Sequence, residues 1–258
     1  MRLMKRILSA AAVLALSASL LVGCSSGTAS SVPVSASSAA ESTVSSVEET
    51  ASSAADENEA AAAQLLNDLT GSYQELWPVI LADEYKQTWL DDCTALVGED
   101  NAEAAFEKLS SMVTGDVYGE DAVKAYANGG GAYFCGFTNS LATLTFDGET
   151  STISGTDKDG NVLFSHTYHY IGMEPVRGLY EFESDDADSG EFTYFFLAPD
   201  TSAETYHIEF RYGSDAEALS QYDAGEYAYW LASGISTDCD QTMINNCIEL
   251  FCTENLAG

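Results

Sequence analysis

Apolar residues follow two different periods along this chain, and the change falls at the glycines 129–131. Before these glycines, apolar side chains recur at every third or fourth position, which is typical of amphipathic helices. After them, short segments rich in β-branched and aromatic residues alternate with turn sequences such as Asp147-Gly148 and Ser189-Gly190. The pattern therefore predicts a helical part followed by an antiparallel meander, which either closes into a barrel or packs as a sandwich.

The predicted elements make up one domain, from residue 60 to residue 258. Helices are expected at residues 60–66, 78–96, 102–112, 120–127, 216–222 and 239–251. Strands are expected at residues 69–77, 134–137, 141–146, 150–155, 162–171, 179–183, 192–197 and 205–211. This order predicts a mainly β domain with added helices, of ordinary size for a single domain.

The first 59 residues carry neither pattern. Residues 1–23 join three basic residues to an apolar run that ends in Leu-Val-Gly, directly before Cys24. This order is typical of a bacterial lipoprotein signal peptide, which predicts that Cys24 is acylated and becomes the mature N-terminus. Residues 24–59 are mostly Ser, Ala, Thr, Val and Glu, so we expect a disordered tether. Together they predict a lipid anchor on the extracytoplasmic face of the cell membrane.

The chain is strongly acidic, with a formal net charge of −32. Removal of residues 1–23 takes away three basic residues and no acidic one, which leaves about −35. A surface of this charge excludes nucleic-acid binding through a basic patch and is repelled by anionic lipid headgroups. We therefore expect the lipid alone to hold the protein at the membrane.

Five cysteines follow Cys24, an odd number in a compartment that permits disulfides. We expect one or two disulfides, with Cys93–Cys135 and a bridge involving Cys239 as candidates. No Cys-x-x-Cys sequence is present, so neither a zinc knuckle nor a redox motif is expected.

The candidate chemistry lies on the predicted strand 205–211. His207 and Glu209 are two positions apart, so both side chains leave the same face of a strand, an arrangement that suits a divalent metal. We expect them to project together into the closed meander. The chain has two other histidines, His166 and His169, whose spacing places them on opposite faces of one strand. It lacks the common nucleophile, nucleotide and metalloprotease motifs, so we expect a binding protein and not an enzyme.

Several segments together resemble the ZinT/YodA family of zinc-binding, lipocalin-like proteins. They are LTGSYQELW at residues 69–77, YHYIGME at 168–174, YEFESDDADSG at 180–190, FFLAP at 195–199 and HIEFRYG at 207–213. The resemblance covers the chain from residue 69 to the C-terminus, with inserted residues around 100–131. It implies a lipocalin/calycin-like antiparallel β-barrel with added helices.

The resemblance also implies a zinc site of three histidines at the barrel mouth, one before Ala-Pro and two as His-x-His on the next strand. In this chain His207 matches the first histidine of the pair, Glu209 replaces the second, and Phe195 stands in place of the histidine before Ala-Pro. The family's His-rich N-terminal segment is absent. An inward-pointing His169 or His166 would restore a third ligand.

Two hypotheses follow from this altered set. The first is a membrane-anchored binder of zinc or another divalent cation that hands the metal to an import lipoprotein or transporter, as the resemblance implies. The alternative is a degenerate family member whose barrel holds a small organic ligand, or which acts as an interaction module without metal.

Overall fold

A computed structural model of the chain describes residues 57–115, 117–198 and 207–257. They belong to one compact unit, residues 45–258. The predicted signal peptide, Cys24 and most of the predicted tether lie outside the described residues. No helix in the described ranges is long and apolar enough to cross a membrane.

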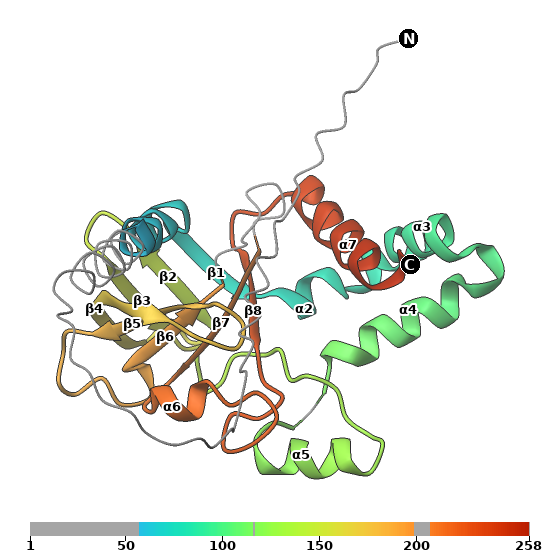
Figure 1. Cartoon of the computed structure of the whole chain (residues 1–258). Coiled ribbons are helices and arrows are strands. Elements are labelled where there is room, and N and C mark those ends of the chain that lie inside the picture. The colour runs from blue at the N-terminus through green and yellow to red at the C-terminus, as the bar shows by residue number, and fades with distance from the viewer. Residues whose placement is uncertain (1–56, 116, 199–206, 258) are drawn as a thin grey trace, which may run out of the picture. The chain divides into compact units, whose positions relative to one another are not determined.

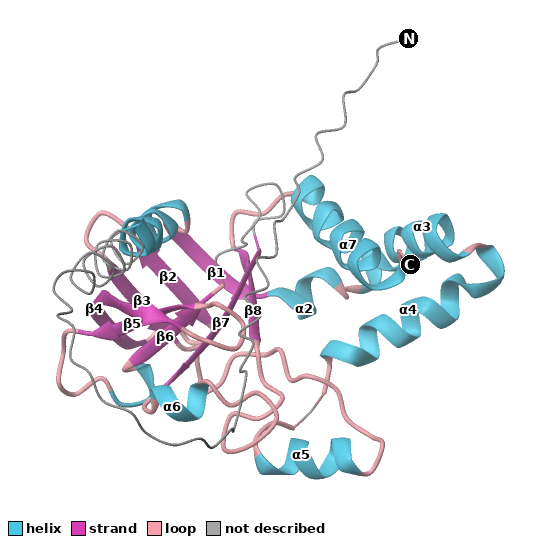
Figure 2. Cartoon of the chain, in the orientation of Figure 1, coloured by secondary structure: helices cyan, strands magenta, loops and turns pink. Residues whose placement is uncertain are grey.

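Eight antiparallel strands form a closed barrel in the described part of the chain, each paired with the next in sequence (Figures 1 and 2). The strands are β1 (Gly71–Glu75), β2 (Thr143–Asp147), β3 (Thr152–Thr156), β4 (Val162–Met173), β5 (Tyr180–Ser184), β6 (Tyr194–Leu197), β7 (His207–Gly213) and β8 (Ala232–Ser236). Pairing of β8 with β1, from Tyr73 opposite Ser236 to Glu75 opposite Gly234, closes the ring. The barrel with added helices is thus confirmed, and the sandwich is excluded.

Aromatic side chains fill the interior of the barrel. Phe195 on β6 is fully buried, with its ring centroid 5.4 Å from those of Tyr168 and Tyr212 and 6.4 Å from that of Phe210. Barrels of eight strands have interiors just wide enough for side chains or one small ligand. Here large rings take up that space, which disfavours a ligand inside the barrel.

The helices come from the segment before β1, from insertions between strands and from the C-terminal segment. A first helix covers residues 57–68. The others are α2 (Leu76–Ile80), α3 (Lys86–Val97), α4 (Glu99–Val113), α5 (Glu120–Ala127), α6 (Ala216–Leu219) and α7 (Gln241–Leu256), with 3-10 turns at Asp83–Tyr85 and Gly190–Phe192. Helices α2, α3, α4 and α7 lie together on one side of the barrel (Figure 1).

These helices share a second core, built around Trp89 of α3. Its indole ring is fully buried against Phe106 of α4 and Phe251 of α7, and its Nε1–H donates a hydrogen bond of 2.7 Å to the carbonyl of Ile80. Ile235 of β8 belongs to the same cluster. This apolar contact fixes the helices, and α7 in particular, against the outer wall of the barrel.

Three predicted elements differ from the structure. Residues 134–137 form no strand; only Phe134 makes isolated bridges. Strand β8 was not predicted, because Ala-Ser-Gly-Ile-Ser offers few large apolar residues. Pro78 does not stop a strand but lies in the first turn of α2, where a missing N–H costs little.

The predicted disulfides are wrong. None of the five described cysteines forms a disulfide, and Cys93 lies near Cys252, with 3.9 Å between the sulfur atoms. Cys93 and Cys135 belong to the same apolar cluster, but Cys135 also lines a cavity together with Trp77 and Glu209.

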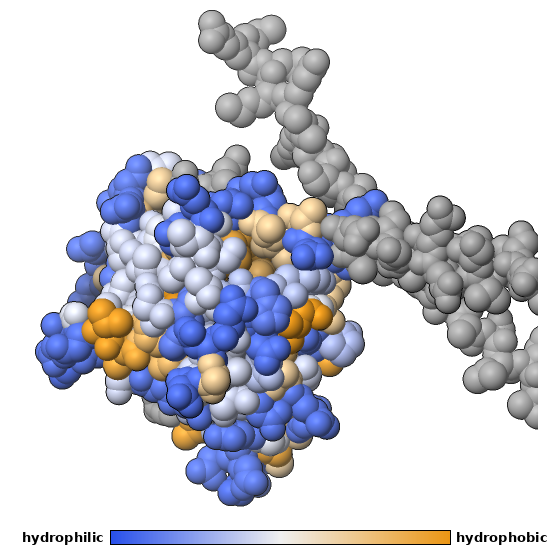
Figure 3. All heavy atoms as spheres, turned by 90° about the vertical axis from the view of Figure 1, so that its left-hand side faces the viewer, coloured by the Kyte–Doolittle hydropathy of each residue, from blue (hydrophilic) through white to orange (hydrophobic). Residues whose placement is uncertain are grey.

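One side of the surface is mostly hydrophilic, with apolar atoms in small separate groups (Figure 3). This agrees with the acidic composition and shows no broad apolar patch on that face.

Candidate metal-binding site

Strand β7 carries His207 and Glu209 on the outer face of the barrel. The alternate residues Ile208, Phe210 and Tyr212 are buried in the barrel core, so the two polar side chains point the other way. The prediction that they project into the closed meander is therefore wrong. Both are half-buried, because helices cover this part of the barrel wall.

Arg211, the next residue on the outer face, is fully buried and serves the structure. Its guanidinium donates hydrogen bonds to the backbone carbonyls of Leu219 and Tyr227 and lies 4.3 Å from the ring centroid of Tyr222. Burial lowers the pKa of the guanidinium. Arg211 thus holds the segment between β7 and β8, and it leaves His207 and Glu209 to face α7.

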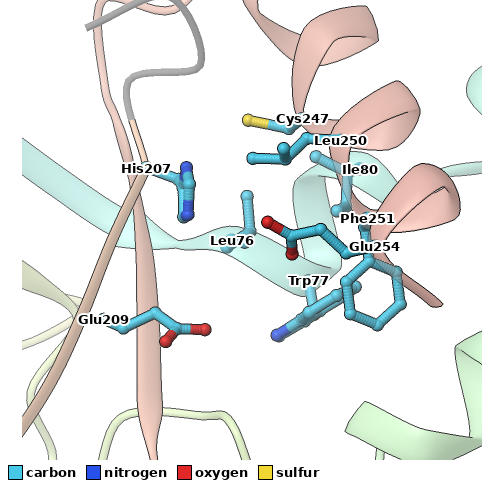
Figure 4. Close-up of a pocket in the computed structure, with 9 residues that line it drawn as sticks. All are labelled: Leu76, Trp77, Ile80, His207, Glu209, Cys247, Leu250, Phe251 and Glu254. Carbon is cyan, nitrogen blue, oxygen red and sulfur yellow. The ribbon is translucent and has the colours of Figure 1, made fainter. Parts of the chain in front are cut away.

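A small cavity separates β7 from α7, with a volume of about 40 Å³. His207 and Glu209 line it from β7, and Cys247 and Glu254 line it from α7. In Figure 4 the carboxylate of Glu254 and the sulfur of Cys247 point from the helix toward His207. The remaining wall is apolar, formed by Leu76, Trp77, Ile80, Leu250 and Phe251.

The helix α7 brings two possible ligands that the sequence interpretation missed. Cys247, Phe251 and Glu254 follow one another at four and three positions, so they share one face of the helix. A helix was predicted at residues 239–251, but α7 runs on to Leu256, so the prediction ended before Glu254. Asp240 caps the helix by accepting hydrogen bonds of 2.9 Å from the N–H groups of Thr242 and Met243.

The thiol of Cys247 is protonated at neutral pH. Burial raises its pKa to about 12, and the nearby Cys239 adds to the shift. A metal would have to displace this proton before the sulfur could bind. The imidazole and the two carboxylates are therefore the readier donors.

The donor types in the cavity fit zinc, which binds imidazole nitrogen, carboxylate oxygen and thiolate sulfur. Within the described ranges, however, no three His, Cys, Asp or Glu side chains already converge closely enough to hold an ion. The arrangement offers ligands from two elements, and a bound ion would have to draw the flexible Glu254 toward β7.

The structure does not bring His166 or His169 to this site. Both lie on β4, and strands β5 and β6 separate β4 from β7 in the barrel. His166 Nδ1 lies 2.8 Å from Asp186 Oδ2, and His169 Nδ1 lies 2.7 Å from Asp185 Oδ1. The two imidazoles thus pair with the acidic turn after β5, and neither supplies the third ligand beside His207.

Phe195, which replaces a histidine in the resemblance, also lies away from the cavity. Its ring points into the barrel interior, on the opposite side of the wall from His207 and Glu209. The polar side chains that line the cavity opposite His207 and Glu209 therefore come from α7 and not from β6.

Comparison with known proteins gives the following picture. The strand pairing defines a lipocalin-like barrel with added helices. Among solved structures, the chain is similar to the Zn(II)-bound ZinT-like domain of Streptococcus pneumoniae AdcA, with 16% identity over 71% of this chain and 89% of that chain, and a TM-score of 0.45. It is also similar to Zn(II)-bound AdcA from Streptococcus pneumoniae, with 14% identity, 72% of this chain, 35% of that chain and a TM-score of 0.43.

The chain spans about a third of the length of the AdcA chain. No protein-family model matches it, and neither does any curated protein.

Proposed function

We propose that this protein binds a divalent cation, zinc first, between β7 and α7. His207, Glu209 and Glu254 would be the ligands, with Cys247 as a further donor once its proton is lost. The observation that carries the proposal is that these four side chains, from two elements, line one small cavity. The histidine and the carboxylate on β7 thus face two further possible ligands on α7 across the same cavity.

The size of the cavity favours an ion over an organic molecule. A volume of about 40 Å³ exceeds the roughly 10–15 Å³ that one water needs. It is far below the roughly 300 Å³ at which small-molecule pockets begin. An ion with one or two waters fits, and an organic ligand does not.

The donor types favour zinc over harder cations. Calcium and magnesium prefer sites made entirely of oxygen, whereas this cavity offers nitrogen and sulfur besides carboxylate. Zinc is also the ion in both of the similar structures, although our choice rests on the donor types of this chain. With one imidazole in place of three, we expect weaker binding than at a three-histidine site.

The cellular setting of the proposal comes from residues outside the described ranges. Acylation of Cys24 would anchor the protein on the extracytoplasmic face of the cell membrane, with residues 24–59 as the tether. A surface-held cation binder could pass its metal to an import lipoprotein or transporter. We propose a binding role and no catalysis.

Calorimetric titration of the full-length protein with zinc at pH 7.5 tests the proposal. We expect saturable binding of one ion with a dissociation constant of about 1 µM or below. His207→Ala should weaken binding by at least about a hundredfold, and Glu254→Gln by about tenfold, because each removes one ligand. His169→Ala is the matched control, because this imidazole pairs with Asp185 on another part of the barrel.

Two results would contradict the proposal. One is the absence of zinc binding in the folded wild-type protein. The other is binding that His169→Ala reduces as strongly as His207→Ala, since the ion would then lie beside β4.

A further inference from the structure

A second cavity, of about 170 Å³, adjoins the first. Trp77, Glu209 and Phe251 line both, so the two spaces lie on either side of these residues. The second cavity is too large for a bare ion, since its volume is about ten times or more the roughly 10–15 Å³ that one water needs. It is small enough to select a compact metabolite over a drug-sized molecule.

The lining of this cavity contains one cationic and one anionic side chain. Arg177 comes from the turn after β4, and Glu209 comes from β7. The guanidinium of Arg177 lies 5.7 Å from the ring centroid of Tyr133 and 4.8 Å from that of Tyr222. These two rings hold it in a defined position by cation–π contact.

Two neutral hydrogen-bond donors face the same space. The Ser233 hydroxyl lies on β8, and the indole of Trp77 lies on α2. Trp77 is only 8% exposed, and its Nε1–H makes no well-formed hydrogen bond among the described residues; its neighbour is the Cys135 sulfur, whose pKa it lowers. Sulfur is a weak acceptor, so a carboxylate oxygen supplied by a ligand would satisfy the indole N–H better.

The rest of the lining is apolar. It consists of Met112, Val113, Tyr133, Leu231 and Phe251, with the protonated thiol of Cys135. These side chains come from α4, the loop before β2, the segment before β8, and α7. A ligand with a short hydrocarbon group would gain from burying it here.

The charges of Glu209 and Arg177 both affect the pKa of one lining group, the Cys135 thiol. Burial raises the pKa of this thiol to about 12, Glu209 raises it further, and Arg177 lowers it. The two opposite charges therefore lie within electrostatic reach of the same sulfur atom. This places the cation and the anion around one small space and not at distant ends of a groove.

We propose that this cavity binds a zwitterion, an α-amino acid with a short apolar side chain. The ligand carboxylate would pair with Arg177 and accept from the Trp77 N–H and the Ser233 hydroxyl. Its ammonium would face Glu209, and its side chain would occupy the apolar wall. A ligand with a carboxylate alone would be repelled by the negative charge of Glu209. A ligand with an amine alone would be repelled by the positive charge of Arg177.

Titration of the metal-free, full-length protein with L-leucine, followed by calorimetry, tests this proposal. We expect a dissociation constant of about 0.1–1 mM. 4-Methylpentanoate, which lacks the ammonium, and isoamylamine, which lacks the carboxylate, should each bind at least about tenfold more weakly, since each leaves one charge of the cavity unmatched.

Variants separate this site from the metal site. Arg177→Gln should weaken leucine binding by about ten- to a hundredfold and leave zinc binding unchanged. Because the Arg177 side chain is exposed, the variant should fold normally, which circular dichroism verifies. Trp77→Phe keeps an aromatic ring but removes the indole N–H, and should weaken leucine binding by about fivefold. His207→Ala should weaken zinc binding by at least about a hundredfold while leucine binding persists.

The proposal is overturned if 10 mM L-leucine produces no binding heat in the folded protein. Equal binding of leucine, 4-methylpentanoate and isoamylamine overturns it too, because the cavity would then recognise only the hydrocarbon group. Leucine binding that survives Arg177→Gln places the ligand elsewhere. None of these results changes the outcome of the zinc titration, so the proposed function is tested independently.

Discussion

Replacing Phe195 by histidine restores the residue that the ZinT resemblance leads one to expect before Ala-Pro. The structure predicts that Phe195→His adds no metal ligand. The side chain is fully buried in the barrel interior, whereas His207 and Glu209 lie on the outer face of the wall. The imidazole would therefore enter an aromatic core and not the cavity beneath α7.

The cost to stability can be worked out from the surroundings of Phe195. Loss of a buried phenyl ring costs about 3–5 kcal/mol when alanine replaces it, and histidine recovers part of that contact, which leaves about 2 kcal/mol. The hydroxyls of the two nearest rings are already engaged, since Tyr168 donates to the carbonyl of Phe192 and Tyr212 to that of Thr138. An unsatisfied imidazole adds about 1–3 kcal/mol. We expect a total of about 3–5 kcal/mol.

Thermal unfolding and zinc calorimetry of the same variant provide the assay. For a domain of this size, about 3 kcal/mol corresponds to a fall in Tm of about 6–12 °C. The zinc dissociation constant should stay within about twofold of the wild-type value. Phe195→Leu, which keeps the site apolar, is the control and should lose less stability. Tighter zinc binding by Phe195→His with an unchanged Tm would refute the placement of β6 and β7 described above.

Three further predictions concern stability. Above pH 9 the free energy of unfolding should fall as pH rises, because burial raises the pKa of Cys135 and Cys247 from about 9 to about 12, so the unfolded chain releases these protons first. Each thiol should contribute up to about 1.4 kcal/mol per pH unit to the slope in urea titrations under reducing conditions. Replacing both by alanine should remove that share and leave the share of other buried groups such as Tyr73, whose pKa burial also raises to about 12; an unchanged slope would contradict this. Trp89→Phe should lower the free energy of unfolding in urea by about 1–3 kcal/mol, because it removes the hydrogen bond to the Ile80 carbonyl. Trp77→Phe should cost clearly less, because the Trp77 N–H makes no well-formed hydrogen bond among the described residues; equal costs would refute the reasoning. Asp240→Ala should lower stability by about 0.5–2 kcal/mol through loss of the α7 cap, and a neutral result would show that the cap is not needed.

The strands of the barrel were largely predictable because their sequence alternates and their turns are marked. Strand β8 was not predictable, because its small residues, Ala-Ser-Gly-Ile-Ser, are typical of a loop. They form a strand only because they pair with β1 and β7. Closure of the ring depends on that strand. For this reason the sequence could not decide between barrel and sandwich.

The site was predicted in part. The same-face pairing of His207 and Glu209 follows from strand geometry alone. The prediction placed the two side chains on the inner face of the barrel wall, which is wrong. The alternate residues Ile208, Phe210 and Tyr212 are apolar and therefore occupy the core. The position of Glu254 at the cavity could not be predicted from the local sequence, because only the packing of α7 over β7 brings it there.

The most direct test of the central claim is anomalous diffraction at the zinc absorption edge from crystals of the zinc-loaded protein. The account predicts a single strong peak between β7 and α7, about 2.0–2.2 Å from a nitrogen of His207 and from carboxylate oxygens of Glu209 and Glu254. A peak beside His166 and Asp186, beside His169 and Asp185, or inside the barrel would contradict it.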